Sequence, residues 1–294
     1  MTGSFRSGYV SFIGRPNVGK STLLNIVLGQ KIAIVAGRQQ TTRNRILGIK
    51  NYPEAQIIFV DTPGIHAPRH ALGRIMVKTA REVLSEMDLV VFVAEPKAID
   101  KDRYIIESFK NLGKPVILLL NKIDKIRKPE ILSLIAAYRD IIPFKEIIPV
   151  SAIKNDGVDL FLLKVLEYLP QGPKYYSDDL VTDLMERFMV SEVIREKIVE
   201  STSEEIPHSV AVEVISWNEK RDGLLVIGAN IYVEREGQKG IIIGNRGKML
   251  KHIGTMARLD IEKLLDAKIF LELWVKVKKG WRDDKKMLNE LGYR

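Results

Sequence analysis

A glycine-rich run near the start of the chain has the spacing of a phosphate-binding loop. It reads G-R-P-N-V-G-K-S from Gly14 to Ser21. Main-chain N–H groups in such a loop surround a polyphosphate at the positive end of the following helix. Lys20 would reach the β and γ phosphates, and the Ser21 hydroxyl would ligate Mg²⁺. The run predicts nucleotide binding with Mg²⁺ as cofactor, through the candidate residues Gly14, Asn17, Val18, Gly19, Lys20, Ser21 and Thr22.

The run Asp61-Thr62-Pro63-Gly64 supplies groups for the phosphate end of the same site. It directly follows an apolar stretch that is predicted as a strand. An aspartate there can hold Mg²⁺ through a water molecule, and the Gly64 N–H can meet the γ phosphate. Asp61 is therefore a candidate ligand of the metal, and Gly64 is a candidate catalytic residue together with Lys20.

A second set of residues would recognise the base. Asn121-Lys122-Ile123-Asp124 follows another apolar stretch, and Ser151-Ala152 follows the next. Only guanine offers two adjacent N–H donors to a carboxylate such as Asp124, so adenine would leave that buried acceptor unpaired. Lys122 would lie along the base, Asn121 would brace the loops, and the Ala152 N–H would face the guanine oxygen. These residues predict a site specific for guanine.

The first 170 residues alternate short apolar stretches with amphipathic ones, the pattern of an α/β domain. We expect a mixed, mostly parallel six-stranded sheet with helices on both faces. The predicted strands are 9–13, 45–50, 56–60, 89–94, 116–120 and 146–150, and the predicted helices 20–28, 72–86, 101–112, 129–140 and 157–168. The second and third strands are too close for a crossover helix, so a hairpin at 51–54 is expected. Ligands of such a sheet bind at the carboxyl ends of its strands.

Prolines and a glycine at 170–173 mark a domain boundary. We expect a first domain over 1–172, a linker over 173–180 and a second domain over 181–294. In the second domain a helix over about 180–201 precedes two strand-like stretches, a short helix, a long helix and a final alternating strand. The order is αββααβ.

The turn Gly244-Asn245-Arg246-Gly247 lies between the two later helices. With the α+β order, it resembles a type II KH domain, in which such glycines let a nucleic-acid backbone approach and a groove takes about four unpaired bases. The resemblance implies a single-stranded RNA site formed by Lys239, Ile243, Gly244, Asn245, Arg246, Gly247, Lys248 and Lys251. Ile242 and Ile243 are candidates for the groove, although core packing is the favoured role for both. Trp274 and Trp281 could stack on bases or fix the C-terminal segment to the sheet, and His252 is expected on the surface.

Together, the phosphate loop, Gln39-Gln40-Thr41-Thr42-Arg43 and the Asp-Thr-Pro-Gly run resemble the Era family of P-loop GTPases over nearly the whole chain. The resemblance implies that Thr42 ligates Mg²⁺ and senses the γ phosphate, with Thr41 as the alternative. It also implies GTP as substrate, the 3′ end of 16S ribosomal RNA as partner, and a role in assembly of the 30S subunit.

Ile65 stands where many regulatory GTPases carry a glutamine that orients the attacking water. An isoleucine cannot hydrogen-bond water, so slow unaided hydrolysis is expected. Asn17 is a candidate ligand for a K⁺ ion that would act in place of an arginine finger. Arg43 is the other candidate cation, although a solvated loop charge is the favoured interpretation.

The chain of 294 residues has a net charge of +9 and no cysteine. The first fact favours polyanionic partners, and the second excludes disulfides and cysteine-built zinc sites. The absence of cysteine also favours a reducing setting, so we expect a cytoplasmic protein, and we expect a monomer. No apolar stretch is long enough to span a membrane, and peripheral association with the cytoplasmic face of the membrane is left open. The alternatives to an RNA-switching GTPase are a membrane-peripheral signalling GTPase and an RNA-binding module that holds GTP without turnover.

Overall fold

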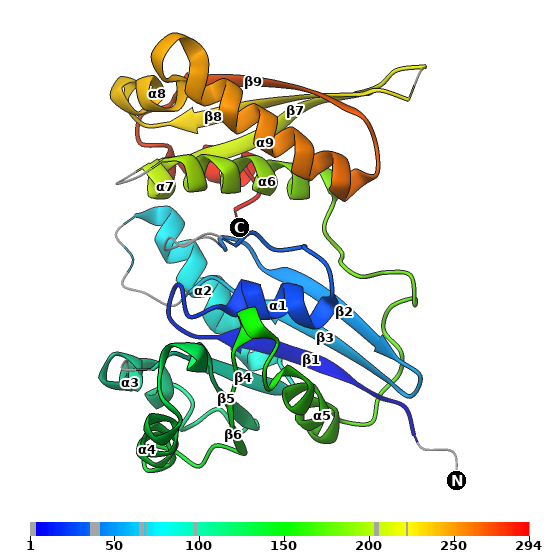
Figure 1. Ribbon diagram of the computed structural model, residues 1–294, viewed down its shortest axis with the longest axis vertical. Coiled ribbons are helices and arrows are strands. Elements are labelled where there is room, and N and C mark those ends of the chain that lie inside the picture. The colour runs from blue at the N-terminus through cyan, green and yellow to red at the C-terminus, as the bar shows by residue number, and fades with distance from the viewer. Residues whose placement is uncertain are drawn as a thin grey trace. The chain divides into compact units, whose positions relative to one another are not determined.

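The computed structural model describes residues 4–35, 42–64, 68, 70–96, 99–202, 206–221 and 223–293. It divides into two compact units (Figure 1). The first contains a six-stranded sheet and consists of Met1–Ala33, Thr42–Ala67 and Met76–Asp183, and the second consists of Leu184–Arg294 with the short segments Ile34–Thr41 and Pro68–Ile75. The helix predicted to begin at about 180 begins only at Glu186, and residues 180–183 belong to the first unit.

The sheet of the first unit is mixed and mostly parallel, as predicted. Its strand order is β2-β3-β1-β4-β5-β6, and only β2 runs antiparallel, to β3. The short turn between β2 and β3 is the predicted hairpin. The strands are β1 (Arg6–Ile13), β2 (Ile46–Tyr52), β3 (Ala55–Asp61), β4 (Leu89–Ala94), β5 (Val116–Leu120) and β6 (Glu146–Pro149).

Helices cover both faces of this sheet, because the central strands are apolar on both sides. On one face α1 and α5 pack over Phe12 and Phe59, whose rings stack at 5.3 Å and contact Phe161 of α5. On the other face α2, α3 and α4 enclose a core that includes Phe92 and Tyr138. The helices are α1 (Lys20–Leu28), α2 (Ala71–Glu86), α3 (Ile99–Glu107), α4 (Lys128–Arg139) and α5 (Val158–Tyr168).

The carboxyl ends of β1, β3, β4, β5 and β6 all lie at one edge of the sheet. The phosphate loop follows β1, the Asp-Thr-Pro-Gly run ends β3, and the base-recognition residues follow β5 and β6. The topology thus gathers segments that are far apart in the sequence.

An extended segment over residues 173–183 completes the first unit by covering the edge strand β2. The Ile49 N–H donates to the Val181 oxygen (2.8 Å), and the Thr182 hydroxyl donates to the Leu47 oxygen (2.7 Å). Edge strands carry unpaired main-chain groups, and these bonds satisfy two of them. The same bonds explain why the next helix begins late.

The second unit has the predicted αββααβ order. Its three-stranded sheet has the order β7-β8-β9, with β7 antiparallel and β9 parallel to β8. Apolar residues of α6 and α9 pack on one face of it, among them Ile194 and Ile253. The elements are α6 (Glu186–Ser201), α7 (Ile206–Ser209), β7 (Ala211–Glu219), β8 (Leu225–Val233), α8 (Glu236–Ile243), α9 (Lys248–Leu265), β9 (Ile269–Val277) and α10 (Lys285–Glu290).

The C-terminal segment is fixed to the second unit by Trp281. Its side chain is fully buried, and its indole N–H donates to the Ser209 oxygen at 2.9 Å. Of the two roles left open for this tryptophan, the packing role is therefore the one it has. Among the described residues, no helix combines the length and the apolarity needed to cross a bilayer.

Candidate guanine nucleotide and RNA sites

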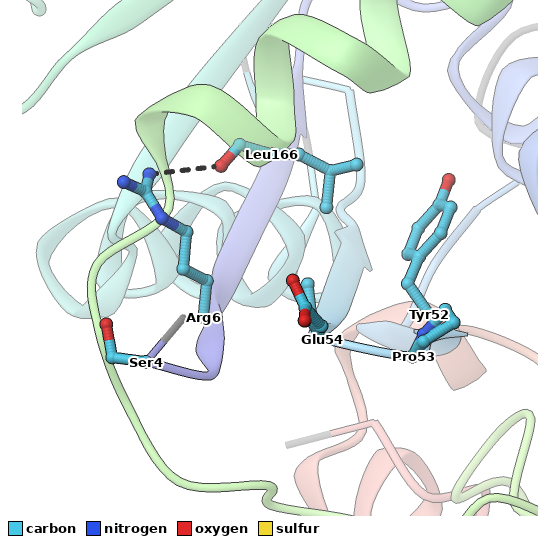
Figure 2. A pocket seen from close by; sticks show the side chains of 7 residues that line it. Ser4, Arg6, Tyr52, Pro53, Glu54 and Leu166 are labelled. Carbon is cyan, nitrogen blue, oxygen red and sulfur yellow. Dashed lines mark hydrogen bonds between the residues drawn. The ribbon is translucent and has the colours of Figure 1, made fainter. Parts of the chain in front are cut away.

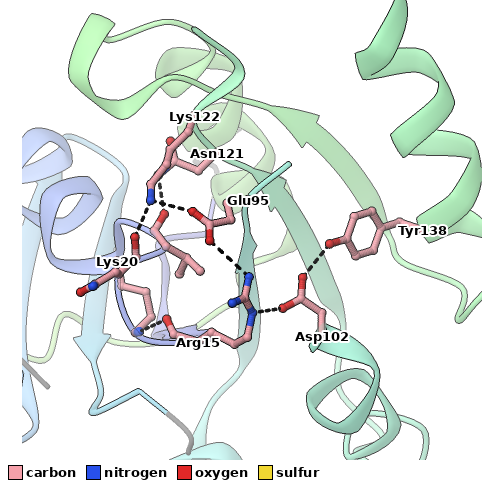
Figure 3. A network of polar contacts seen from close by, with 9 residues as sticks. Arg15, Lys20, Glu95, Asp102, Asn121, Lys122 and Tyr138 are labelled. Carbon is pink, nitrogen blue, oxygen red and sulfur yellow. Dashed lines mark hydrogen bonds and ion pairs between the residues drawn. The ribbon is translucent and has the colours of Figure 1, made fainter. Parts of the chain in front are cut away.

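The phosphate loop, Gly14–Ser21, joins the end of β1 to the start of α1. Asn17 adopts a left-handed conformation with φ 65°, which turns the chain back toward the helix. The Lys20 ammonium donates 3.1 Å hydrogen bonds to the Gly14 and Arg15 oxygens, so it lies across the loop (Figure 3). A bound polyphosphate would find this cation inside the loop.

Three oxygen-bearing side chains meet beneath the loop, and we call Ser21, Thr42 and Asp61 the oxygen cluster. The Ser21 hydroxyl lies 2.8 Å from that of Thr42 and donates to Asp61 Oδ2 at 2.6 Å. The Thr42 hydroxyl donates to the same oxygen at 3.0 Å. Thr42, the residue favoured over Thr41, thus lies with the two other residues predicted to hold Mg²⁺.

The oxygen cluster fits Mg²⁺. Asp61 is fully buried, and its Oδ1 atom has no hydrogen-bond partner among the residues that the structure describes. An orphaned buried carboxylate oxygen is costly without a cation or water, and Mg²⁺ prefers hard oxygen ligands with one or two carboxylates and substrate phosphates. Among the described residues, no group of three or more His, Cys, Asp or Glu could hold a metal. A Mg²⁺ ion would therefore depend on the cluster and on the nucleotide.

Burial shifts the pKa values of the charged residues beside the loop. It lowers the pKa of Lys20 to about 8, against the opposing attraction of Asp61. It raises the pKa of Asp61, with Lys20 and the two hydroxyls acting in the other direction. Burial thus disfavours the charged forms of both residues, and a bound polyphosphate and metal ion would offset this desolvation cost.

Gly64 lies against the phosphate loop. A Cβ atom on this residue would come within 2.9 Å of the Pro16 nitrogen, so any larger residue would push the two segments apart. The Asp-Thr-Pro-Gly run therefore contacts the phosphate loop, next to which it is predicted to lie. Ile65 and Gln39 to Thr41 lie outside the described residues.

Asn121 braces three segments. Its amide nitrogen donates to the Val18 oxygen at 2.8 Å, and its amide oxygen accepts from the Ala152 N–H at 3.1 Å. It is 2% exposed, so both bonds are shielded from water. A guanine oxygen facing Ala152 would have to share this N–H with Asn121.

Asp124 is held by Ser151 at the predicted base site. The Ser151 hydroxyl donates to Asp124 Oδ1 at 2.6 Å, and this bond keeps the pKa of Asp124 below its ordinary value. Lys122 has a left-handed backbone (φ 64°), and its ammonium donates to the Asn17 oxygen at 2.6 Å. The base-recognition loop, Asn121–Asp124, thus contacts the phosphate loop directly.

Arg43 is buried, so the expectation that it is a solvated loop charge is wrong. It is 3% exposed. The neighbouring Thr42 donates a hydrogen bond to the buried Asp61, and this bond keeps the main chain next to Arg43 inside the protein. The polarity of the sequence does not indicate this burial, because the burial of an arginine in a polar loop depends on tertiary contacts.

A polar network that the sequence pattern does not predict lies beside the loop (Figure 3). Arg15 contacts Glu95 at 3.3 Å and the buried Asp102 at 2.7 Å, and Asp102 accepts from the Tyr138 hydroxyl at 2.7 Å. Burial raises the pKa of Asp102. Glu95 directly follows β4, so the rule that ligands bind at carboxyl ends of strands would have found it.

A separate pocket of about 580 Å³ lies at the opposite end of β1 (Figure 2). Arg6 in its wall donates to the Leu166, Glu167 and Leu169 oxygens, which completes the C-terminus of α5. The pocket is lined by Ser4, Arg6, Tyr52, Pro53, Glu54, Ala55 and Leu166. None of these is a predicted site residue, and β1 separates them from the nucleotide site.

In the second unit the predicted RNA turn joins α8 to α9. Gly244 has φ 71°, and a Cβ there would lie 2.6 Å from Met249 Cβ, so only glycine fits. Arg246 is also left-handed, with φ 51°. The side chains of Asn245, Arg246, Lys248 and Lys251 are exposed, while Lys239 and Ile243 are half-buried.

Other candidates of this unit separate into core and surface. Ile242 is fully buried, so core packing is its role. His252 is exposed, as expected. Trp274 is 42% exposed, in contrast to Trp281, and remains a candidate for stacking.

Comparison with known proteins agrees with both units. Residues 9–122 match the family described as 50S ribosome-binding GTPase, and residues 205–282 match the KH domain. The chain is 52% identical to GTPase Era of Ruminiclostridium cellulolyticum over 99% of its length and 98% of that protein. It is 54% identical to GTPase Era of Geobacter metallireducens over 98% of each chain.

Two solved Era structures superpose with a TM-score of 0.94 at 42% identity, covering 98% of this chain and 99% of theirs. One is a variant of Aquifex aeolicus Era bound to GDP and AlF4⁻. The other is Era in complex with MgGDPNP and nucleotides 1506–1542 of 16S ribosomal RNA. A P-loop GTPase domain followed by a KH domain, matched over the full length by these proteins, places the chain in the Era family of GTPases.

Proposed function

We propose that this protein binds and hydrolyses GTP through the phosphate loop, the oxygen cluster and the base-recognition loop, and that its nucleotide state controls binding of the 3′ end of 16S ribosomal RNA during 30S assembly. The observation that carries the proposal is the convergence of Ser21, Thr42 and Asp61 within 3.0 Å beneath Lys20. A relative bound to MgGDPNP and 16S ribosomal RNA supports it. Binding of ribosomal RNA implies a cytoplasmic location.

Hydrolysis at this site needs positioning and charge neutralisation more than covalent chemistry. Lys20 and the loop N–H groups would stabilise charge on the β–γ bridging oxygen, and the Gly64 N–H would meet the γ phosphate. Ser21 and Thr42 would ligate Mg²⁺ directly and Asp61 through water, and the ion would neutralise phosphate charge. Multiple turnover of GTP would support this, whereas binding without turnover would favour the alternative of an RNA module that only holds GTP.

Asn17 is the proposed protein ligand of an activating K⁺ ion. Its place in the phosphate loop and the apolar Ile65 motivate the proposal. Turnover is compared in K⁺ and Na⁺ for the native protein and Asn17→Ala. Faster turnover in K⁺ that the variant loses is expected, and equal native rates in the two salts would exclude the role.

The second unit is proposed to bind single-stranded RNA at the Gly244–Gly247 turn. Exposed Arg246, Lys248 and Lys251 would contact phosphates, and half-buried Ile243 would contribute to the groove for bases. Crosslinking with RNA sequencing in the GTP-bound state should recover the 16S 3′ end. Co-sedimentation with anionic vesicles, without RNA capture, would instead favour a membrane-peripheral GTPase.

Coupling between nucleotide and RNA follows the rule of linkage. If GTP tightens RNA binding, RNA must tighten GTP binding by the same factor. We expect RNA affinity to differ between GDP and a non-hydrolysable GTP analogue. Identical RNA affinities with GDP and with the analogue would show that the nucleotide does not control RNA binding and that the two binding activities are independent.

A further inference from the structure

Glu95 lies between the two halves of the nucleotide site. It directly follows β4, and β4 is hydrogen-bonded to β1 on one side and to β5 on the other. The phosphate loop follows β1 and the base-recognition loop follows β5. A side chain at the end of β4 can therefore reach both loops.

The Glu95 carboxylate contacts one cation from each loop (Figure 3). Its Oε1 atom accepts from Arg15 Nη2 at 3.3 Å, and its Oε2 atom accepts from the Lys122 ammonium at 2.7 Å. These side chains are only 17% (Arg15), 26% (Lys122) and 29% (Glu95) exposed, so the pairs are less screened than surface ion pairs. Without the carboxylate, two like charges would remain close together.

Both cations belong to residues that also contact the groups expected to bind the nucleotide, Arg15 through its main-chain oxygen and Lys122 through its ammonium. The Arg15 oxygen accepts from the Lys20 ammonium at 3.1 Å, and Lys122 bonds the Asn17 oxygen. Asn17 and Lys122 are both left-handed non-glycine residues, a conformation that costs about 1 kcal/mol or more and persists only where surrounding contacts fix it. The contacts of Glu95 help to fix this strained pair.

We propose that Glu95 is a positioning residue that couples the base-recognition loop to the phosphate loop and thereby sets how long a guanine nucleotide stays bound. The inference rests on the proposed nucleotide site. Glu95 holds the Lys122 side chain where the guanine base is expected to bind. It also holds the Arg15 side chain, and the main-chain oxygen of Arg15 orients Lys20. Asp102 and Tyr138 anchor the far side of Arg15.

The test is the rate of GDP release from the full-length protein carrying Glu95→Gln. We expect release at least tenfold faster, because the amide cannot balance two cations, and about tenfold weaker GDP affinity. In steady-state hydrolysis KM should rise while kcat stays within twofold, the sign of lost binding shared by ground and transition states. Asp100→Asn, which neutralises a carboxylate that is 90% exposed on α3, is the matched control.

A double-mutant cycle separates coupling from general loosening. In a Lys122→Met background the Glu95→Gln substitution should change GDP release by less than threefold, because the shared contact is already gone. Native release from Glu95→Gln, or its full effect in the Lys122→Met background, would overturn the inference. Failure of the native protein to bind GDP would instead overturn the proposed function.

Discussion

The amide nitrogen of Asn121 donates a 2.8 Å hydrogen bond to the main-chain oxygen of Val18, which ties the loop that would read the base to the loop that would hold the phosphates. The other end of the same amide accepts from Ala152. One buried side chain thus spans the segments after β1, β5 and β6. Its geometry suits a site in which base and phosphates are held together.

Removing this brace should weaken nucleotide binding. Asn121→Ala leaves the buried Val18 oxygen and Ala152 N–H without partners, which costs about 1–3 kcal/mol for each unsatisfied group. We expect GDP affinity to fall by tenfold or more in a calorimetric titration. The control is Asn51→Ala, which removes two side-chain bonds, to Asp178 and Gln56, away from the site. Unchanged affinity in Asn121→Ala would show that the brace is dispensable.

Asp124 should decide which purine is bound. Asp124→Asn replaces an acceptor by a group that can donate, so it should lose the two guanine N–H bonds and accept xanthine, whose C2 carries an oxygen. We expect GDP affinity to fall by about 10⁴-fold, while XDP binding rises. Competition against a fluorescent GDP measures both. Asp140→Asn, on the exposed end of α4, should change neither. Retained preference for GDP would place base recognition elsewhere.

Lys20 should destabilise the nucleotide-free protein. Its pKa is lowered from 10.5 to about 8, so the unfolded state binds more protons between these values and stability rises with pH there. Below pH 8 the buried charge costs about 3 kcal/mol, at about 1.4 kcal/mol per pKa unit. Lys20→Met should therefore raise the melting temperature at pH 7 in EDTA, and the gain should shrink by pH 10.

The exposed Lys110→Met is the control for that experiment. It should leave the melting temperature nearly unchanged at both pH values. A Lys20→Met protein that melts at or below the native temperature at pH 7 would show that the ammonium is stabilising in the folded state. Loss of GDP binding in the same variant would confirm that the lysine is kept for its ligand.

The sequence predicted the fold because its signals are local. Each central strand is a short apolar stretch such as Val116–Leu120, fully buried in the sheet, and the loops that follow carry the recognisable residues. Once a parallel sheet is expected, Asp61 and Asn121 must lie at one edge. The predicted convergence therefore needed no knowledge of side-chain positions.

What the sequence did not predict depends on contacts between distant segments. Arg15 and Asp102 form a 2.7 Å ion pair that neither local pattern indicates. The sequence around Arg43 predicts a solvated charge, but Arg43 is buried because the neighbouring Thr42 bonds inward. The helix α6 begins late because Val181 pairs with an edge strand. Each case is a tertiary interaction that overrides a local preference.

Arg246 should supply RNA affinity without sequence preference. It is exposed on the turn between α8 and α9, where its guanidinium can reach a phosphate. Arg246→Ala should weaken binding about equally for matched and scrambled single strands, and the slope of log affinity against log salt should fall by about one. Lys263→Ala, an exposed cation near the other end of α9, is the control and should leave the slope unchanged. If both variants lower affinity alike, the turn is no more than part of a general basic surface, whereas a loss confined to the matched strand would mean that Arg246 contacts a base.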